Sequence, residues 1–256
     1  MPTKQPDPFF IGWSKKPPKA LRWFLFVVSA VLVGAAAGVA FGLGASLSDP
    51  GDGHFSWSQN QQPLMGVIEA KPYPILRVVK EGQQGSSEAI LLAGIGKRGI
   101  QSKLTADISG PVKIQGVPLK RGTINMLQVG RIEALEETAA ASQQSPIISP
   151  SKSLGRWRLT GEICDGKCYI GAMRPGNGLA HKACANLCII GGLPPVFVTS
   201  SPIKGQSFFL LSDEQGNPLS SDFLDYTALL ISMEGEVEQR DDLLIFKIDP
   251  TSVERL

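Results

Sequence analysis

The chain has 256 residues, a formal net charge of +2 and only 19% charged residues. This balance, and the lack of basic patches interleaved with aromatic residues, argue against a nucleic-acid partner. Glycine and proline together make up 47 residues, which favours β-structure with many turns over a helical bundle.

The N-terminal part has the pattern of a membrane anchor. Residues 1–22 are basic, and the 25 residues from Trp23 to Leu47 carry no charge. At about 1.5 Å per residue, a helix of that length exceeds the bilayer hydrocarbon core of about 30 Å. The alternative is a cleaved signal peptide with its cleavage site near Gly44-Ala45-Ser46. The long leading segment and the long apolar run favour a retained transmembrane helix over residues 23–47.

The charges beside this helix predict its orientation. Lys15, Lys16, Lys19 and Arg22 precede the apolar run, which places the N-terminus in the cytoplasm. The rest of the chain then lies across the membrane, in an oxidising compartment. No N-x-S/T glycosylation site occurs in the chain, so we expect a bacterial inner membrane protein with periplasmic domains.

Small residues recur along one face of the predicted helix, at Ala30, Gly34, Gly38 and Gly42. Such a stripe allows a second helix to approach closely. We therefore expect a helix partner, either another transmembrane protein or a second copy of this chain.

Residues 48–63 are polar and predict a linker, in which His54 is solvated. Residues 64–135 predict a first β module. Its expected strands cover residues 66–70, 75–80, 89–93, 111–116 and 124–132.

Gly94 to Gly99 reads G-x-G-x-x-G, but a dinucleotide site also needs a following helix. The next residues are interrupted by Gly110 and Pro111, so we expect a turn there. Lys97, Arg98 and Lys103 predict a solvated basic rim.

Residues 136–154 predict a helix and linker, with a short helix over 132–141. Residues 155–256 predict a second β module with a helical turn over 219–226. Its expected strands cover residues 156–163, 195–200, 206–212, 228–237 and 243–248.

The C-terminal ends of the two modules resemble each other at a constant offset of 119 residues. Gly116 aligns with Gly235, and Arg121 aligns with Arg240. Each aligned stretch predicts a strand, a glycine bend and a second strand. We therefore expect a mainly β protein with two tandem, five-stranded, OB-like barrels.

All four cysteines lie in one segment, which we expect to follow the first strand of the second module. Cys164, Cys168, Cys184 and Cys188 combine with His181 in the spacing C-x3-C-x12-H-x2-C-x3-C. If residues 179–188 form a helix, the histidine and the last two cysteines share one face.

Three interpretations of this segment stay open. Disulfides among Cys164, Cys168, Cys184 and Cys188 would staple it, either through a Cys164–Cys168 bridge across a hairpin at Asp165-Gly166 or through bridges from these two cysteines to the helix. A metal site of Cys168, His181, Cys184 and Cys188 would suit zinc, or copper as a soft ion. A thiol redox site is the third, although C-x-x-C is absent.

The segment from Cys164 to Pro195 resembles one found in uncharacterised, membrane-anchored bacterial proteins. In these, a small β domain carries Cys, then His-x2-Cys-x3-Cys, then Gly-Gly-x-Pro-Pro, which match Cys168, the 181–188 stretch and residues 191–195. Cys164 departs from the pattern, which has an apolar residue there. The resemblance implies a membrane-anchored β domain and no particular activity.

The chain lacks G-x-S-x-G, H-E-x-x-H and P-loop motifs, so the sequence favours a binding protein over an enzyme. Our leading hypothesis is a periplasm-facing accessory protein of a larger membrane complex, such as a respiratory or redox complex, with a metal-binding or disulfide-stapled Cys/His site. The alternative is a stand-alone periplasmic metal-handling or thiol redox protein.

Overall fold

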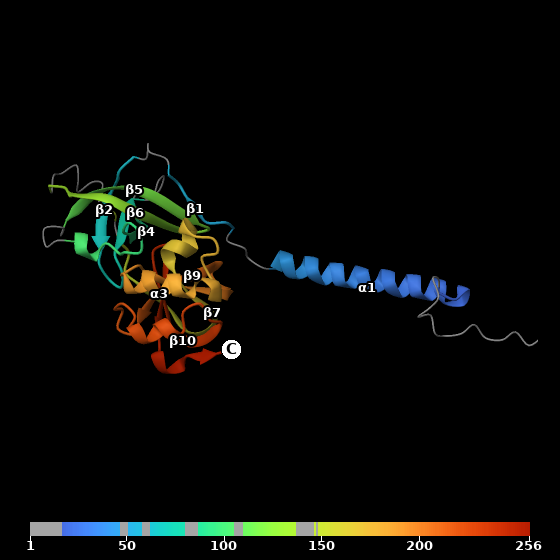
Figure 1. Ribbon diagram of the computed structural model, residues 1–256. Helices are drawn as coiled ribbons and strands as arrows, with labels where there is room; N and C mark the ends of the chain where they lie inside the picture. The colour runs from blue at the N-terminus through green and yellow to red at the C-terminus, as the bar shows by residue number, and fades with distance from the viewer. Residues whose placement is uncertain are drawn as a thin grey trace, which may run out of the picture. The chain divides into compact units, whose positions relative to one another are not determined.

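The structure is a computed structural model that describes residues 17–46, 51–57, 62–79, 87–104, 110–136, 146 and 148–256. It divides into two units, Met1–Ser48 and Asp49–Leu256. The first unit contains helix α1 (Lys19–Ser46), drawn in blue in Figure 1. This helix is long and apolar enough to cross a membrane, a test that a signal sequence also passes.

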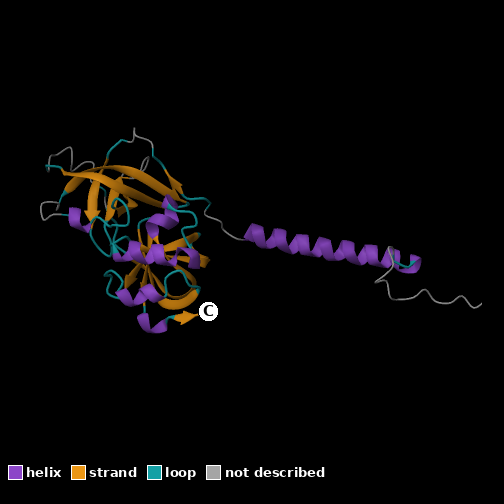
Figure 2. Ribbon diagram, in the orientation of Figure 1, coloured by secondary structure: helices purple, strands orange, loops and turns teal. Residues whose placement is uncertain are grey.

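The second unit contains two closed five-stranded barrels, seen as orange strands in Figure 2. The first barrel comprises β2 (Leu64–Glu69), β3 (Ile75–Val79), β4 (Ser87–Ala93), β5 (Pro111–Arg121) and β6 (Ile124–Ala134). The second comprises β7 (Lys152–Asp165), β8 (Pro195–Ile203), β9 (Gln206–Asp213), β10 (Ile231–Arg240) and β11 (Leu243–Ile248).

The strand order is the same in both barrels. The first strand pairs with the second, the second with the third and the fourth with the first, all antiparallel. The fifth strand closes each barrel, parallel to the third and antiparallel to the fourth. This order confirms the prediction of a mainly β protein with two tandem OB-like barrels.

The described residues also form several short strands and turns outside the ten barrel strands. Two-residue strands extend the sheets, β1 (His54–Phe55) on β5 and β12 (Glu254–Arg255) on β10. Short 3-10 turns outside the Cys/His segment are η1 (Gln101–Lys103), η4 (Ser221–Asp225) and η5 (Pro250–Ser252).

The predicted repeat has a physical basis at one glycine in each barrel. A Cβ on Gly116 would lie 2.3 Å from the carbonyl oxygen of Gln128, and a Cβ on Gly235 would lie 2.2 Å from that of Lys247. The contacted residues are themselves 119 apart. Each fourth strand therefore passes so close to the fifth that only glycine fits.

Residue alternation explains how the barrels join. In β4, Leu91 belongs to a cluster shared by both barrels, while Ile90 and Leu92 belong to the core of the first barrel. In β9, Leu210 belongs to the shared cluster and Phe209 to the core of the second barrel. Side chains on successive strand residues point to opposite faces, so these strands are apolar on both.

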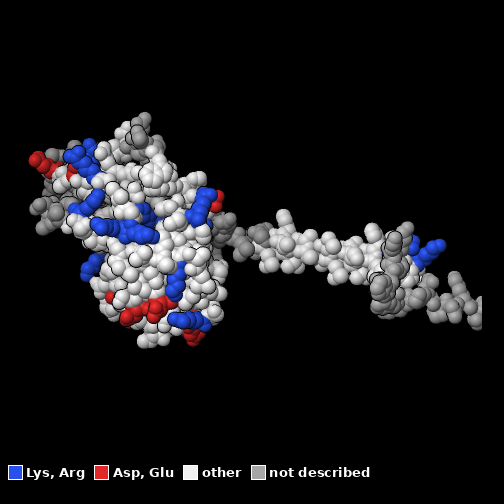
Figure 3. All heavy atoms as spheres, viewed as in Figure 1, with Lys and Arg blue, Asp and Glu red and all other residues white. Residues whose placement is uncertain are grey.

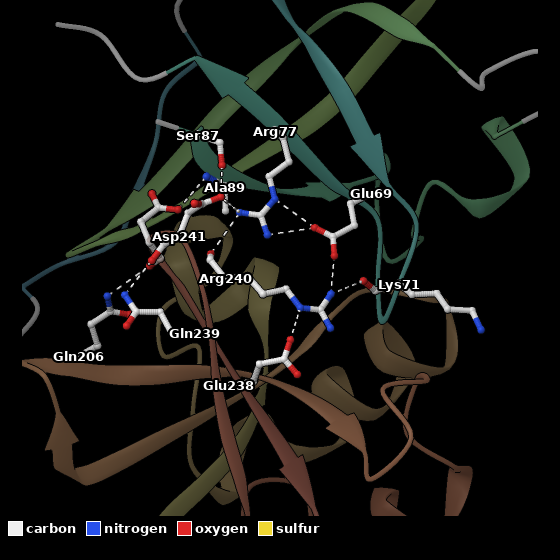
Figure 4. Close-up of polar contacts among 11 residues, drawn as sticks. Glu69, Lys71, Arg77, Ser87, Ala89, Gln206, Glu238, Gln239, Arg240 and Asp241 are labelled. Atoms are coloured by element: carbon white, nitrogen blue, oxygen red, sulfur yellow. Dashed lines mark hydrogen bonds and ion pairs between the residues drawn. The ribbon is translucent and has the colours of Figure 1, made fainter. Parts of the chain in front are cut away.

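Polar residues beside this apolar contact link the barrels as well (Figure 4). Arg77 is fully buried, and its guanidinium donates two hydrogen bonds to Glu69 at 3.0 and 3.1 Å. Glu69 also pairs with Arg240 of the second barrel. Ser87 bonds to Asp241, and the Ala89 amide donates to Asp242.

Two local predictions need correction. The predicted helix over 132–141 is wrong where it is described, because β6 continues as a strand to Ala134. Pairing with β5 satisfies the backbone there up to the Leu135 amide, which donates to the Pro111 carbonyl, and this pairing overrides helix propensity. Residues 137–141 lie outside the described residues. Strand β1, with His54, lies within the expected linker.

Candidate metal centre

The Cys/His segment connects β7 to β8, as expected. It contains η2 (Cys168–Ala172), η3 (Leu179–His181) and α3 (Lys182–Ile190), and α3 is labelled on the orange helix in the left part of Figure 1. The near-continuous helix from Leu179 to Ile190 matches the prediction for residues 179–188.

Strand β7 ends in Asp165, which is fully buried, and its Oδ1 accepts the Cys168 amide at 2.8 Å. This bond starts a helical turn where a hairpin was predicted. Cys164 therefore lies opposite Val196 of β8 rather than opposite Cys168. The hairpin geometry behind a Cys164–Cys168 bridge is wrong.

Three of the four cysteines converge. The sulfur atoms of Cys168, Cys184 and Cys188 all lie within 4.8 Å of one another. Two come from successive turns of α3 and the third from η2, so residues up to 20 apart in sequence meet. All four cysteines are free thiols in this structure.

The thiols differ in their tendency to ionise. A hydrogen bond to the Cys188 sulfur, together with burial, raises the pKa of Cys168. The same bond lowers the pKa of Cys188, with a contribution from the nearby Lys97 charge. Within this pair Cys168 keeps its proton, and Cys188 is the first to become a thiolate, the form that binds metals.

His181 lies beside the thiols but engages another group. Its Nε2 is 3.0 Å from Oδ2 of Asp165, and both side chains are buried. Asp165, Cys168 and His181 form a second donor group within 4.8 Å. The structure thus arranges the four predicted ligands as two groups that share Cys168, with His181 supported by a carboxylate.

Two lysines reach this region. The Lys97 Nζ lies 2.6 Å from the Cys184 sulfur. The buried Lys167 donates to the carbonyls of Gly94 and Gly96 at 2.7 and 2.8 Å, and burial lowers its pKa. The G-x-G-x-x-G stretch is a turn, as predicted, but its lysine contacts a thiol instead of being merely solvated.

The surface charge suits an anionic centre. On the face shown in Figure 3, Lys and Arg side chains lie across the middle of the folded part, and Asp and Glu gather below them. Lys97 and Arg98 are both exposed. The positive charge of Lys97 partly offsets the negative charge of a Cys188 thiolate.

Cys164 takes no part in the cluster. Its thiol contacts a carboxylate oxygen of Glu162 at 3.4 Å. Burial and that carboxylate raise the pKa of Cys164 well above its ordinary value. This thiol is therefore a protonated core residue, and it provides a natural control for the other three.

Comparisons of the chain with protein-family models, with curated proteins and with solved structures give no match. The site residues that sequence reasoning missed are Asp165, Lys97 and Lys167. Asp165 lies directly after a cysteine, which is the one local signal for it. The two lysines contact their partners across more than 70 residues of sequence, and no local pattern indicates that.

Proposed function

We propose that the protein is a single-pass accessory or binding protein of a bacterial inner membrane, with its barrels in the periplasm and a thiophilic metal ion bound by Cys168, Cys184 and Cys188. The observation that carries this proposal is the convergence of three sulfur atoms within 4.8 Å. Thiolates select soft or borderline ions, so Cu⁺ and Zn²⁺ are the expected cargo.

In this proposal Asp165 and His181 are not ligands of the ion, and they hold the Cys168 ligand in position. The carboxylate holds both the Cys168 amide and the imidazole, so it fixes the direction from which the Cys168 sulfur approaches the ion. Residues that orient ligands in this way typically affect metal affinity by about 10–100-fold. His181→Ala is therefore expected to weaken binding rather than abolish it.

The test is metal analysis of the full chain, purified in mild detergent with a reductant and loaded with Zn²⁺ or Cu⁺ in separate samples. We expect one ion per chain. Cys168→Ser, Cys184→Ser and Cys188→Ser should each lower occupancy, whereas the matched control Cys164→Ser should retain it. Failure of the wild-type chain to bind either ion, or equal loss in the control, overturns the metal proposal.

The accessory role rests on α1. Apart from the backbone of the helix and the neighbouring residues in the chain, no heavy atom of the described residues lies within 4 Å of a Cβ built on Gly34, Gly38 or Gly42, so the glycines of the stripe leave space for a close helix contact. Copurification of membrane subunits in mild detergent supports an accessory role, and a lone metal-loaded monomer supports a stand-alone metal-handling protein. An alkaline phosphatase fusion after Leu256 should be active, and an inactive one would contradict the orientation.

A further inference from the structure

The distance between the Lys97 Nζ and the Cys184 Sγ, 2.6 Å, does not suit a hydrogen bond. Hydrogen bonds from nitrogen to oxygen span about 2.7–3.2 Å, and sulfur is larger than oxygen. The distance is also too long for a direct bond, since even two bonded sulfur atoms are only about 2.05 Å apart. A gap of this size fits one bridging atom.

The contact is held in place by the surrounding backbone. The Gly99 amide donates to the Gly191 carbonyl at 2.8 Å, just beyond the end of α3. A Cβ on Gly191 would lie 1.9 Å from the Lys97 carbonyl oxygen. The loop of residues 94–99 therefore packs directly against the C-terminal end of α3. Lys167 also holds this loop, by donating hydrogen bonds to the Gly94 and Gly96 carbonyls.

The pair is also accessible, unlike the other thiols of the cluster. Cys184 is partly exposed and Lys97 is exposed, whereas Cys168 and Cys188 are buried. A small oxidant therefore reaches Cys184 first. Susceptibility of a cysteine to oxidation follows its exposure.

We propose that Lys97 and Cys184 form a covalent Nζ–O–Sγ link, with dioxygen as the oxidant. After the ammonium has released its extra proton to water, one N–H bond and the S–H bond break, and N–O and O–S bonds form. The nitrogen and the sulfur each give up two electrons. The second oxygen atom takes the two hydrogens and leaves as water, so atoms and electrons balance.

The link makes the number of free thiols in the cluster depend on oxidation. A sulfur bonded to oxygen is no longer a thiolate, so the linked protein has two metal-binding thiols in place of three. Two equivalents of a dithiol supply the four electrons that restore the amine and the thiol and release water. The effect on metal binding rests on the proposed function, whereas the link itself does not.

The test compares metal-free full-length protein in detergent after exposure to air with the same protein after dithiothreitol, by intact mass and by peptide mapping. We expect air to add one oxygen and remove two hydrogens, to join the peptides containing Lys97 and Cys184, and to block trypsin after Lys97. Dithiothreitol should reverse all three changes.

Lys97→Arg and Cys184→Ser should both lack the link. The control Lys182→Arg, in which the altered lysine contacts the Asp225 carbonyl oxygen instead of a sulfur, should retain it. Full alkylation of all four thiols after exposure to air overturns the proposal, as does loss of two hydrogens without gain of oxygen, or the same mass gain in Lys97→Arg. A linked protein that binds no metal when reduced would instead refute only the metal function.

Discussion

Arg77 is expected to be the most sensitive polar residue at the contact between the barrels. Its side chain is fully buried and holds Glu69 through two hydrogen bonds, the Arg240 carbonyl at 3.3 Å, and Asp241 at 3.8 Å. Arg77→Met keeps much of the volume and removes the charge. Removing one partner of a buried ion pair typically costs about 3–5 kcal/mol.

The expected cost lies near the lower limit of this range. Glu69 is partly exposed and keeps Arg240 as a second partner, so water and that arginine compensate for part of the loss. We therefore expect the free energy of unfolding to fall by about 3 kcal/mol. Urea unfolding of the full chain in detergent, followed by circular dichroism of the β-sheet signal, measures it.

A surface pair supplies the matched control. Arg131 contacts Glu133 at 2.9 Å, with 73% and 41% of the two side chains exposed, and exposed pairs contribute at most about 1 kcal/mol. Arg131→Met should therefore change the free energy of unfolding far less than Arg77→Met. Equal changes in the two variants would refute the role assigned to Arg77.

Three further predictions concern other parts of the chain. Burial opposes ionisation of Glu238, but hydrogen bonds from Lys247 and Arg240 outweigh it and lower the pKa of Glu238 below 4.5. The contribution of Glu238 to stability is thus complete above about pH 4.5 and lost as the pH falls through the lowered pKa. Urea unfolding at pH 7 and pH 3 should show that the free energy of unfolding falls more in acid for wild type than for Glu238→Gln. Equal falls would contradict this. Burial raises the pKa of Tyr73 to about 12, so an ultraviolet titration should show a late phenolate step that Tyr73→Phe lacks; a wild-type step near pH 10 for every tyrosine would argue against it. Replacing both Gly34 and Gly38 by Ile should weaken association of α1 with its partner while leaving membrane insertion intact, because the change adds bulk to the open face and keeps the helix apolar; unchanged crosslinking or copurification would show the stripe to be incidental.

The barrels were predictable because their signals are local. Short apolar runs predict the strands, the turns between them contain glycine and proline, and the repeat at offset 119 relates the last two strands of one module to those of the other. The Cys/His segment was expected after the first strand of the second module because the residues directly before it, 156–163, have a strand pattern. Over its described part, residues 132–136, the predicted helix is wrong because hairpin pairing of β6 with β5 outweighs a helical composition.

The arrangement of the site was less predictable because its deciding contacts are distant in sequence. The spacing of His181, Cys184 and Cys188 correctly placed them on one helical stretch. It carried no information on Asp165, which lies 16 residues before His181 and binds its imidazole. An apolar strand such as β9 likewise predicts burial on both sides, but not that another barrel covers one of them.

The candidate site depends on both barrels. Its thiols belong to the segment inserted in the second barrel, whereas Lys97 follows β4 of the first. The Lys97–Cys184 distance is therefore set by how the barrels pack, through the loop contacts of Gly99 with Gly191 and of Lys167 with Gly94.

Formation of the Lys97–Cys184 link should therefore depend on the packing of the two barrels. A single intervening oxygen atom tolerates little change in distance, while a solvated lysine tolerates much. If Arg77→Met loosens the barrel contact, it should slow formation of the Lys97–Cys184 link in air before it prevents folding, although Arg77 contacts neither residue. Metal binding by Cys168, Cys184 and Cys188 should be affected less, because all three ligands lie within one inserted segment.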